Sequence, residues 1–235
     1  MNIKTDFYRR LKSQHDAYYQ DLLYRFLNPP ERELVKSIFK GFHIYESNQA
    51  HEYARVYVTD EPKAVDFKIV TLKSTYQDQT LSHRDVLGAL MNLGLERDTF
   101  GDIHITETEL YIQVVSELKS VFMDMHQIKQ DFIYFEEVEG IPEGSKQKSE
   151  VVTLFLDSLR IDALVSKAFT IHREDVKAMI DQEKVKINYF PVQKYTVLVK
   201  PYDIISVRGF GRIILTDDIG TSKSQKTRIK CELLR

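Results

Sequence analysis

A short segment with the composition of a linker, EGIPEGSKQKSE at residues 139–150, divides the chain into two parts of opposite charge. Residues 1–150 carry 18 Lys and Arg against 25 Asp and Glu, a net charge of −7. Residues 151–235 carry 15 against 10, a net charge of +5. Because Gly, Pro, Ser and charged residues favour open linkers, we expect a larger acidic part followed by a separately folded basic part.

The composition is that of a globular protein. Of the 235 residues, 43% are hydrophobic and 29% charged, which excludes a disordered chain. No apolar run approaches the ~20 residues that span a bilayer, and the N-terminus has no secretory signal. The single cysteine, Cys231, excludes an internal disulfide framework. These features predict a cytoplasmic protein.

The first part of the chain predicts an N-terminal α+β region over residues 1–75. Residues 6–27 place apolar side chains near a helical period, and Asn28-Pro29-Pro30 ends that helix. A second helix is expected from there, with Glu31 in its first turn, where the helix dipole favours acids. Residues 53–59 and 66–72 are predicted strands.

The middle of the chain predicts a second domain over residues 76–140. A helix is expected over 83–93, capped by Ser82 and closed by Gly94. Strands over 100–106 and 109–115, a helix over 116–128 and a strand over 132–139 follow. The order of helix, strand, strand, helix and strand predicts a small α/β sandwich that resembles an RNA-recognition (RRM-like) fold.

The basic part, residues 151–235, predicts a strand at 151–156 and helices over 158–169 and 171–183. Short strands are expected at 184–188, 195–199 and 203–215. Two glycines, Gly209 and Gly211, interrupt the last of these strands and predict a bulge, a bend or a close approach by another backbone. In a regular strand Arg208 and Arg212 would lie on the same face. Phe210 between them is expected either to stack on a base or to fill core space.

The two helices of the basic part would present one face of cations: Arg160, Lys167, Arg173 and Lys177. Each alone is ordinarily a solvated helix position, and Arg160 next to Asp162 also fits a structural ion pair. Together they indicate phosphate binding, since Arg and Lys pair with phosphate oxygens and folded RNA is read through its shape and backbone.

Residues 158–208 resemble the S-four RNA-binding module, named after a small-subunit ribosomal protein. The resemblance rests on Arg160-Ile161-Asp162, Arg173-Glu174, residues 184–188, Lys194, and Pro201-Tyr202-Asp203-Ile204. Glu183 and Tyr202 stand where the module usually has glycine in its turns. The resemblance implies an αL-type RNA-binding domain. With the cationic helix face and the glycine-interrupted strand, it gives as candidate contact residues Arg160, Lys167, Arg173, Lys177, Lys184, Lys186, Asn188, Lys194, Arg208 and Arg212.

Two further segments resemble the YlmH family: Arg208-Gly209-Phe210-Gly211-Arg212 after the module, and GLERDTFGDI at residues 94–103 in the middle domain. The resemblance implies binding to rRNA, and to tRNA, on the large ribosomal subunit in ribosome-associated quality control. A link to cell division is also part of the family's description. Arg84 and Arg97 are candidates for a second RNA surface, and ordinary surface arginines are the alternative.

Arranged catalytic chemistry is not evident in the sequence. His51-Glu52 begins a zinc-protease-like string, but position 55 is Arg, and Asp102 and His104 lack nearby further ligands. Cys231 has no evident His partner and is expected to be buried or on an edge strand. We expect no enzyme activity, no cofactor, no metal and a monomer. The alternatives are an RNA-modifying enzyme, of the pseudouridine synthase or methyltransferase kind, and a cell-division adaptor.

Overall fold

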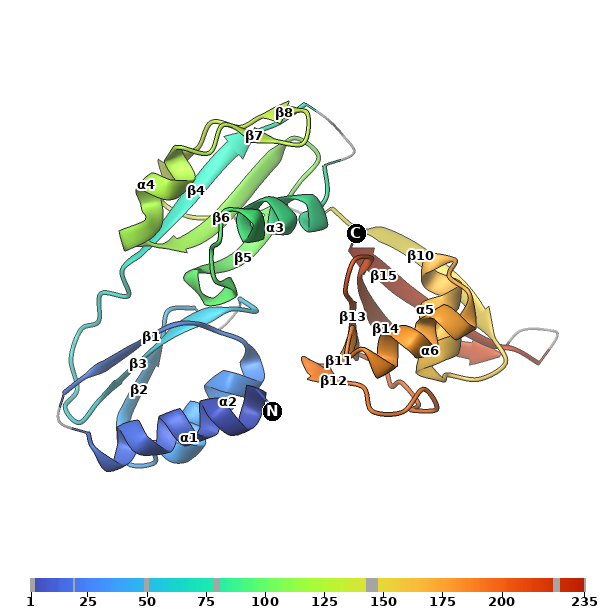
Figure 1. Ribbon diagram of the computed structural model, residues 1–235, viewed down its shortest axis with the longest axis horizontal. Helices are drawn as coiled ribbons and strands as arrows, with labels where there is room; N and C mark the ends of the chain where they lie inside the picture. Colours follow the sequence, from blue (N-terminus) through green and yellow to red (C-terminus); the bar gives the residue numbers. More distant parts are fainter. Residues whose placement is uncertain are drawn as a thin grey trace. The chain divides into compact units, whose positions relative to one another are not determined.

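Helices alternate with antiparallel sheets in the computed structural model, which describes residues 3–18, 20–48, 51–77, 81–142, 148–221 and 225–234 (Figure 1). The predicted α+β class is confirmed. The chain divides into two compact units: Met1–Gln79 with Leu87–Ser145, and Thr80–Val86 with Lys146–Arg235. In the described part of the chain, no helix has the length and apolarity that crossing a membrane requires.

The N-terminal region packs two helices on a three-stranded sheet of order β1-β3-β2 (Figure 1). Its core includes Leu11, Val35, Phe39, Val56 and Val58, all at 0% exposure. Its elements are α1 (Ile3–Asp16), β1 (Leu22–Leu27), α2 (Pro29–Ile38), β2 (His43–Glu46) and β3 (Ala54–Thr59).

The single helix predicted over residues 6–27 is wrong in its second half. Helix α1 ends at Asp16, and β1 pairs with β3 instead. Apart from exposed Arg25, Leu22–Leu27 has only apolar and aromatic side chains, a pattern that a buried strand shares with a buried helix. The pairing with β3 decides between them. The second helix begins as predicted, with a capping box in which Asn28 and Glu31 bond each other's backbone N–H groups.

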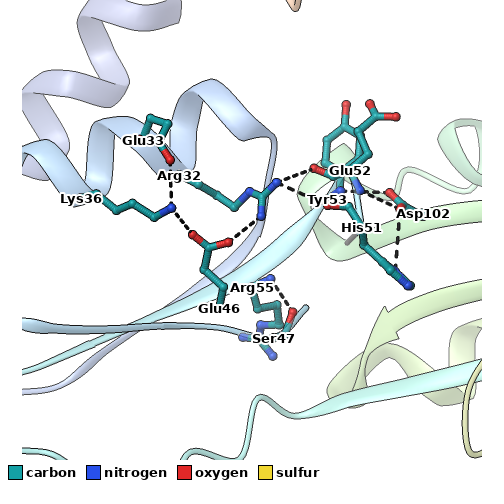
Figure 2. Close-up of polar contacts among 10 residues, drawn as sticks. All are labelled: Arg32, Glu33, Lys36, Glu46, Ser47, His51, Glu52, Tyr53, Arg55 and Asp102. Carbon is teal, nitrogen blue, oxygen red and sulfur yellow. Dashed lines mark hydrogen bonds and ion pairs between the residues drawn. The ribbon is translucent and has the colours of Figure 1, made fainter. Parts of the chain in front are cut away.

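A buried ion network fastens α2 to β2 (Figure 2). Glu46, 5% exposed, receives Arg32 at 2.6 Å and Lys36 at 2.6 Å. Arg32 also donates to the carbonyl groups of His51 and Glu52, which positions the loop before β3. Burial acts to raise the pKa of Glu46, but the hydrogen bond from Lys36 and the charge of Arg32 lower it overall.

The middle region is a four-stranded antiparallel sheet of order β5-β6-β4-β9 with two helices. Its first and third strands are central, which is the split β-α-β-β-α-β arrangement of RNA-recognition folds. Its elements are β4 (Ile69–Thr75), α3 (His83–Asn92), η1 (Arg97–Thr99), β5 (Phe100–Ile105), β6 (Glu109–Val115), η2 (Ser116–Leu118), α4 (Lys119–Met123) and β9 (Glu136–Val138), with a separate hairpin of β7 (Gln127–Ile128) and β8 (Asp131–Phe132).

Strand β4 bears on where the middle region starts. It pairs with β6 over seven residues and with β9 over three. Its sheet therefore lies with the elements that follow it, and we propose that the middle region begins before Ile69 rather than at residue 76.

The predicted cap of α3 is present, since Ser82 and Asp85 bond each other and Gly94 follows the helix at φ +77°. The helix predicted over 116–128 is wrong beyond Met123. A tight turn with Lys129 at φ +54° forms the hairpin β7–β8, and this arrangement buries Ile128 and Ile133. The strand predicted over 132–139 is accordingly divided between β8 and β9.

Residues 94–103 join the N-terminal and middle regions within the first unit. Asp102 accepts the backbone N–H groups of Glu52 and Tyr53 at 2.9 and 3.0 Å (Figure 2). The guanidinium of Arg97 lies 3.7 Å from the ring centroid of Tyr53. The buried ring of Phe26 is so close to Gly101 that an added Cβ would be 2.7 Å from it.

The basic unit, the part of the second compact unit that follows the linker, is a six-stranded antiparallel sheet of order β10-β15-β14-β13-β11-β12 with helices α5 and α6 (Figure 1). One apolar core joins the sheet to these helices. Two helices followed by β-hairpins agree with the predicted αL-type arrangement. Its elements are β10 (Glu150–Leu156), α5 (Ile161–Phe169), α6 (Arg173–Asp181), β11 (Val185–Ile187), β12 (Phe190–Pro191), β13 (Ile204–Val207), β14 (Gly211–Thr221) and β15 (Thr227–Leu234).

Two strand predictions in the basic unit are wrong. Residues 195–199 form a loop held by a single bridge between Arg160 and Leu198. Residues 203–215 form a hairpin of β13 and β14, because Gly209 at φ +89° and Gly211 at φ +119° let the chain reverse. Arg208 and Arg212 therefore do not share a face of one strand; they lie on either side of this turn.

We expect Gly101→Ala to lower the free energy of unfolding by about 1–3 kcal/mol, because the new methyl group overpacks against Phe26. Gly88→Ala is the matched control: it lies in α3 with nothing within 4 Å of the added Cβ, and should stabilise by up to about 1 kcal/mol. Urea unfolding measures both. Equal effects of the two substitutions would contradict the close packing at Gly101.

Cys231 is fully buried on β15, as predicted, and burial raises its pKa to about 11. Since the thiolate is the reactive form, we expect a thiol reagent at pH 8 to modify the native chain roughly 100-fold more slowly than the urea-unfolded chain. Equal rates in the two states would show that the thiol is accessible in the native fold.

Candidate nucleic-acid interface

A buried carboxylate joins the starts of the two helices in the basic unit. Asp162, in the first turn of α5, is 0% exposed and accepts hydrogen bonds from Arg160 at 3.0 and 2.9 Å. It also accepts one from Arg173, the first residue of α6, at 2.9 Å. The two arginines are thus held side by side by one side chain.

The outer parts of both guanidinium groups remain open to solvent. The side chains of Arg160 and Arg173 are 32% and 50% exposed. Each guanidinium carries five N–H donors in a planar fork, so donors beyond those used on Asp162 are available to a ligand. Burial acts to raise the pKa of Asp162, but the hydrogen bonds from Arg160 and Arg173 lower it overall, so the carboxylate is ionised and the pair stays fixed.

Two further groups lie beside this arginine pair. The ring centroid of Tyr195 is 5.7 Å from the Arg160 guanidinium carbon and 5.2 Å from Lys177 Nζ. Lys177 also pairs with Glu174 at 2.8 Å on the surface of α6. We call Arg160, Asp162, Arg173, Lys177 and Tyr195 the helix-start cluster.

The other predicted lysines of the basic unit lie on its helices, strands and loops. Lys167 is exposed in the last turn of α5, Lys186 on β11, and Lys194 in the loop after β12. Lys184, before β11, is only partly exposed, and its carbonyl accepts the backbone N–H of Arg208. These lysines add to the positive charge of the basic unit.

Asn188, a predicted RNA contact, is exposed and also bonds within the chain. Its amide donates to Asp203 at 2.8 Å and its carbonyl oxygen accepts the N–H of Ile204 at 2.9 Å. It therefore joins two loops. Glu183 at φ +55° and Tyr202 at φ +66° adopt the left-handed conformation that glycine favours, so the turns persist although the glycines are replaced.

The hairpin turn presents Arg208 and Phe210, which are exposed, whereas Arg212 on β14 is half-buried. The Phe210 ring, 38% exposed, lies 5.8 Å from that of Phe169 on α5. Phe210 thus contributes packing at one edge and open surface at the other.

Arg84 and Arg97 differ in their surroundings. Arg84 is exposed on α3. Arg97 is half-buried, lies over the rings of Tyr53 and Phe100, and donates to the Phe100 carbonyl at 2.6 Å. These contacts give Arg97 a packing role.

The polar residues considered for metal or catalytic sites are used in packing. Asp102 holds the backbone of residues 52–53, and its own burial is the main cause that raises its pKa. His51 bonds Gln113 at 2.9 Å. Among the described residues, no group of three or more His, Cys, Asp and Glu is arranged to hold a metal ion.

The first unit also contains a cleft of about 390 Å³ between residues 47–48 and the sheet of the middle region. Three carboxylates, Asp66, Glu137 and Glu139, line it, with Lys68 paired to Asp66. Glu137 is also paired, with Lys119, so the lining carries only a small excess of negative charge. That excess disfavours a polyanion, and the basic unit is the better candidate for a phosphate-binding surface.

The sequence did not reveal that the Tyr195 ring lies beside Arg160 and Lys177, because residues 195–199 were expected to form a strand. An aromatic residue directly after Lys194 in a basic stretch was the available signal. The role of Asp162 was visible only as one alternative, an ion pair with Arg160, and its second partner, Arg173, is eleven residues away.

Comparisons with known proteins add three findings. Residues 62–140, which contain β4 to β9, match the family model described as "Putative RNA-binding domain in YlmH". The chain is 28% identical over 230 residues to "Ribosome-associated protein quality control protein P2" of Bacillus subtilis (strain 168), a match that covers 91% of this chain and 88% of that relative.

The chain is also similar in structure to "Cell division protein ylmH from Streptococcus pneumoniae". The TM-score is 0.50 at 23% sequence identity, and the match covers 59% of this chain and 93% of that one. At this identity the similarity concerns the fold.

We expect Asp162→Asn to destabilise the chain by about 2 kcal/mol at pH 7, because two arginines lose a charged, buried acceptor. A lowered carboxyl pKa gives stability that is present above the unfolded pKa, about 4, and is lost as the pH falls through the folded value. The difference from wild type should therefore shrink below about pH 4.

Urea unfolding at a series of pH values measures this difference. Asp181→Asn, at an exposed position at the end of the same helix pair, is the control and should change stability by less than about 0.5 kcal/mol. A loss from Asp162→Asn that stays constant across the acid range would contradict the ionised, doubly paired carboxylate.

Proposed function

We propose that this chain is a member of the YlmH family, because residues 62–140 match that family's RNA-binding domain model and 91% of the chain aligns with the Bacillus subtilis relative. From that premise we propose that it is a non-catalytic RNA-binding protein of the large ribosomal subunit. In this proposal it binds ribosomal RNA, together with tRNA, during quality control of stalled nascent chains, and acts in the cytoplasm as a monomer. The observation that carries it is the pair of arginines fixed by Asp162 on the basic unit.

The two arginines are preorganised for phosphate binding. A flexible arginine loses side-chain entropy when it binds phosphate, whereas Arg160 and Arg173 are already held by hydrogen bonds to one carboxylate. Their open donors, with exposed Lys167, Lys186 and Lys194 on the same unit, suit a ribose-phosphate backbone. Structured RNA is recognised largely through such backbone and shape contacts.

The name of the Bacillus subtilis relative, a ribosome-associated quality control protein, supports the biological setting. The alternative of an RNA-modifying enzyme needs a catalytic group, and the polar clusters considered above have packing partners. Among the comparisons, the alternative of a cell-division adaptor is supported by the name of the Streptococcus pneumoniae protein, whose similarity is one of fold. RNA binding is therefore the function that the site favours.

We expect Arg173→Gln combined with Lys186→Gln to weaken binding to large ribosomal subunits and to reduce the salt dependence of binding. The slope of log K against log salt should become shallower by roughly 0.7–0.9 for each lost phosphate contact. The double variant removes two contacts, so its slope should become shallower by about twice that amount. Both side chains are exposed, and Asp162 keeps its two hydrogen bonds from Arg160. Co-sedimentation at several salt concentrations measures the effect.

Arg9→Gln combined with Lys12→Gln removes the same charge from exposed positions on α1 and is the matched control. It should leave both affinity and slope near the wild-type values. If the two double variants behave alike, the basic unit is not the contact surface and the proposal fails.

A further inference from the structure

The loop between β12 and β13 exposes large apolar side chains in a basic setting. Tyr195 is 43% exposed, Leu198 62% and Tyr202 69%, and Lys194 and Lys200 lie in the same loop. Single exposed apolar residues are ordinary, but several in one loop indicate a binding surface. Among them, Tyr195 is the one that belongs to the helix-start cluster, with its ring near Arg160 and Lys177.

The backbone around Tyr195 is held in place. The N–H of Val197 donates to the carbonyl of Lys194 at 3.2 Å, and the carbonyl of Val197 accepts the N–H of Ile161 at 2.9 Å. The N–H of Val199 donates to Leu159 at 2.9 Å. The loop is therefore anchored to the start of α5, which keeps the aromatic ring close to the arginine pair.

We propose that Tyr195 is a stacking platform for an unpaired RNA base, with Arg160, Arg173 and Lys177 on the adjoining phosphates. This inference rests on the proposed function and deepens it: the module would bind a site where single-stranded nucleotides adjoin folded RNA. Every base has a π face, so an aromatic side chain flanked by cations binds single strands with little sequence preference.

The surroundings of the ring favour a nucleotide over an apolar protein segment. A protein partner would have to desolvate Arg160 and Lys177, which lie within 6 Å of the ring centroid, without neutralising them. A nucleotide brings both components at once, a flat base for the ring and a phosphate for the cations. The anchored loop also reduces the ordering that binding requires.

The chain contains no tryptophan, so Tyr195→Trp introduces a single indole at the proposed contact. We expect its fluorescence to be quenched when the full-length variant binds a single-stranded 12-nucleotide RNA of mixed sequence. The same strand annealed to its complement should bind through phosphates and leave the fluorescence little changed, because its bases are already stacked. Equal quenching by the two RNAs, or none by either under conditions of full binding, would overturn the stacking inference.

Affinity measurements by fluorescence anisotropy of labelled RNA give an independent readout. Tyr195→Ala should weaken binding of the single strand by about 5- to 150-fold, the range typical of one lost aromatic–base stack, and should affect the duplex much less. Tyr195→Phe should bind like wild type, since stacking needs the ring and not the hydroxyl. Tyr134→Ala, at a 68% exposed tyrosine of the first unit, is the matched control.

The outcomes separate the two proposals. If wild type binds RNA and Tyr195→Ala binds each of the two RNAs as tightly as wild type does, the stacking platform is wrong while the RNA-binding function stands. If wild type binds neither RNA at low salt but still sediments with ribosomal subunits, the stacking platform is again wrong. If it binds neither RNA nor ribosomal subunits, both proposals fail.

Discussion

The contact between buried Asp162 and the two arginines is the interaction on which the arrangement of the basic unit depends. One carboxylate bonds the residue before α5 and the first residue of α6, so it fixes both helix starts while it orients two cations. Burying a lone carboxylate is costly, and burying one that is paired twice is tolerated. The same contact therefore serves folding and the presentation of charge.

The first unit uses buried charge in a different way. Glu46, Arg32 and Lys36 fasten a helix to a strand, and Asp102 holds the loop before β3 through two backbone N–H groups. The segment 94–103 that resembled the YlmH family supplies several of these joining contacts. Its side chains are engaged in packing, whereas exposed cations of the basic unit are open to a ligand.

Sequence patterns predicted the elements whose local chemistry is strong. Asn28 and Glu31 marked a helix start, Ser82 and Gly94 bounded another, and the order of elements indicated the middle fold. They failed where a distant partner decides the outcome. Leu22–Leu27 became a strand because β3 pairs with it. At residues 203–215 the two glycines did predict an interruption of the strand, but its form, a full reversal, is set by the pairing of β13 with β14. The second partner of Asp162 is likewise set by helix packing, which no local pattern records.

Lysine footprinting of the full-length chain on large ribosomal subunits tests the central claim most directly. Acetylation rates with and without the particle, read by mass spectrometry, report which ammonium groups become covered. We expect protection of the basic unit, at Lys167, Lys177, Lys186 and Lys194, while exposed lysines of the first unit such as Lys12 and Lys40 stay reactive. Protection confined to the first unit, with those four lysines unchanged, would contradict the central claim.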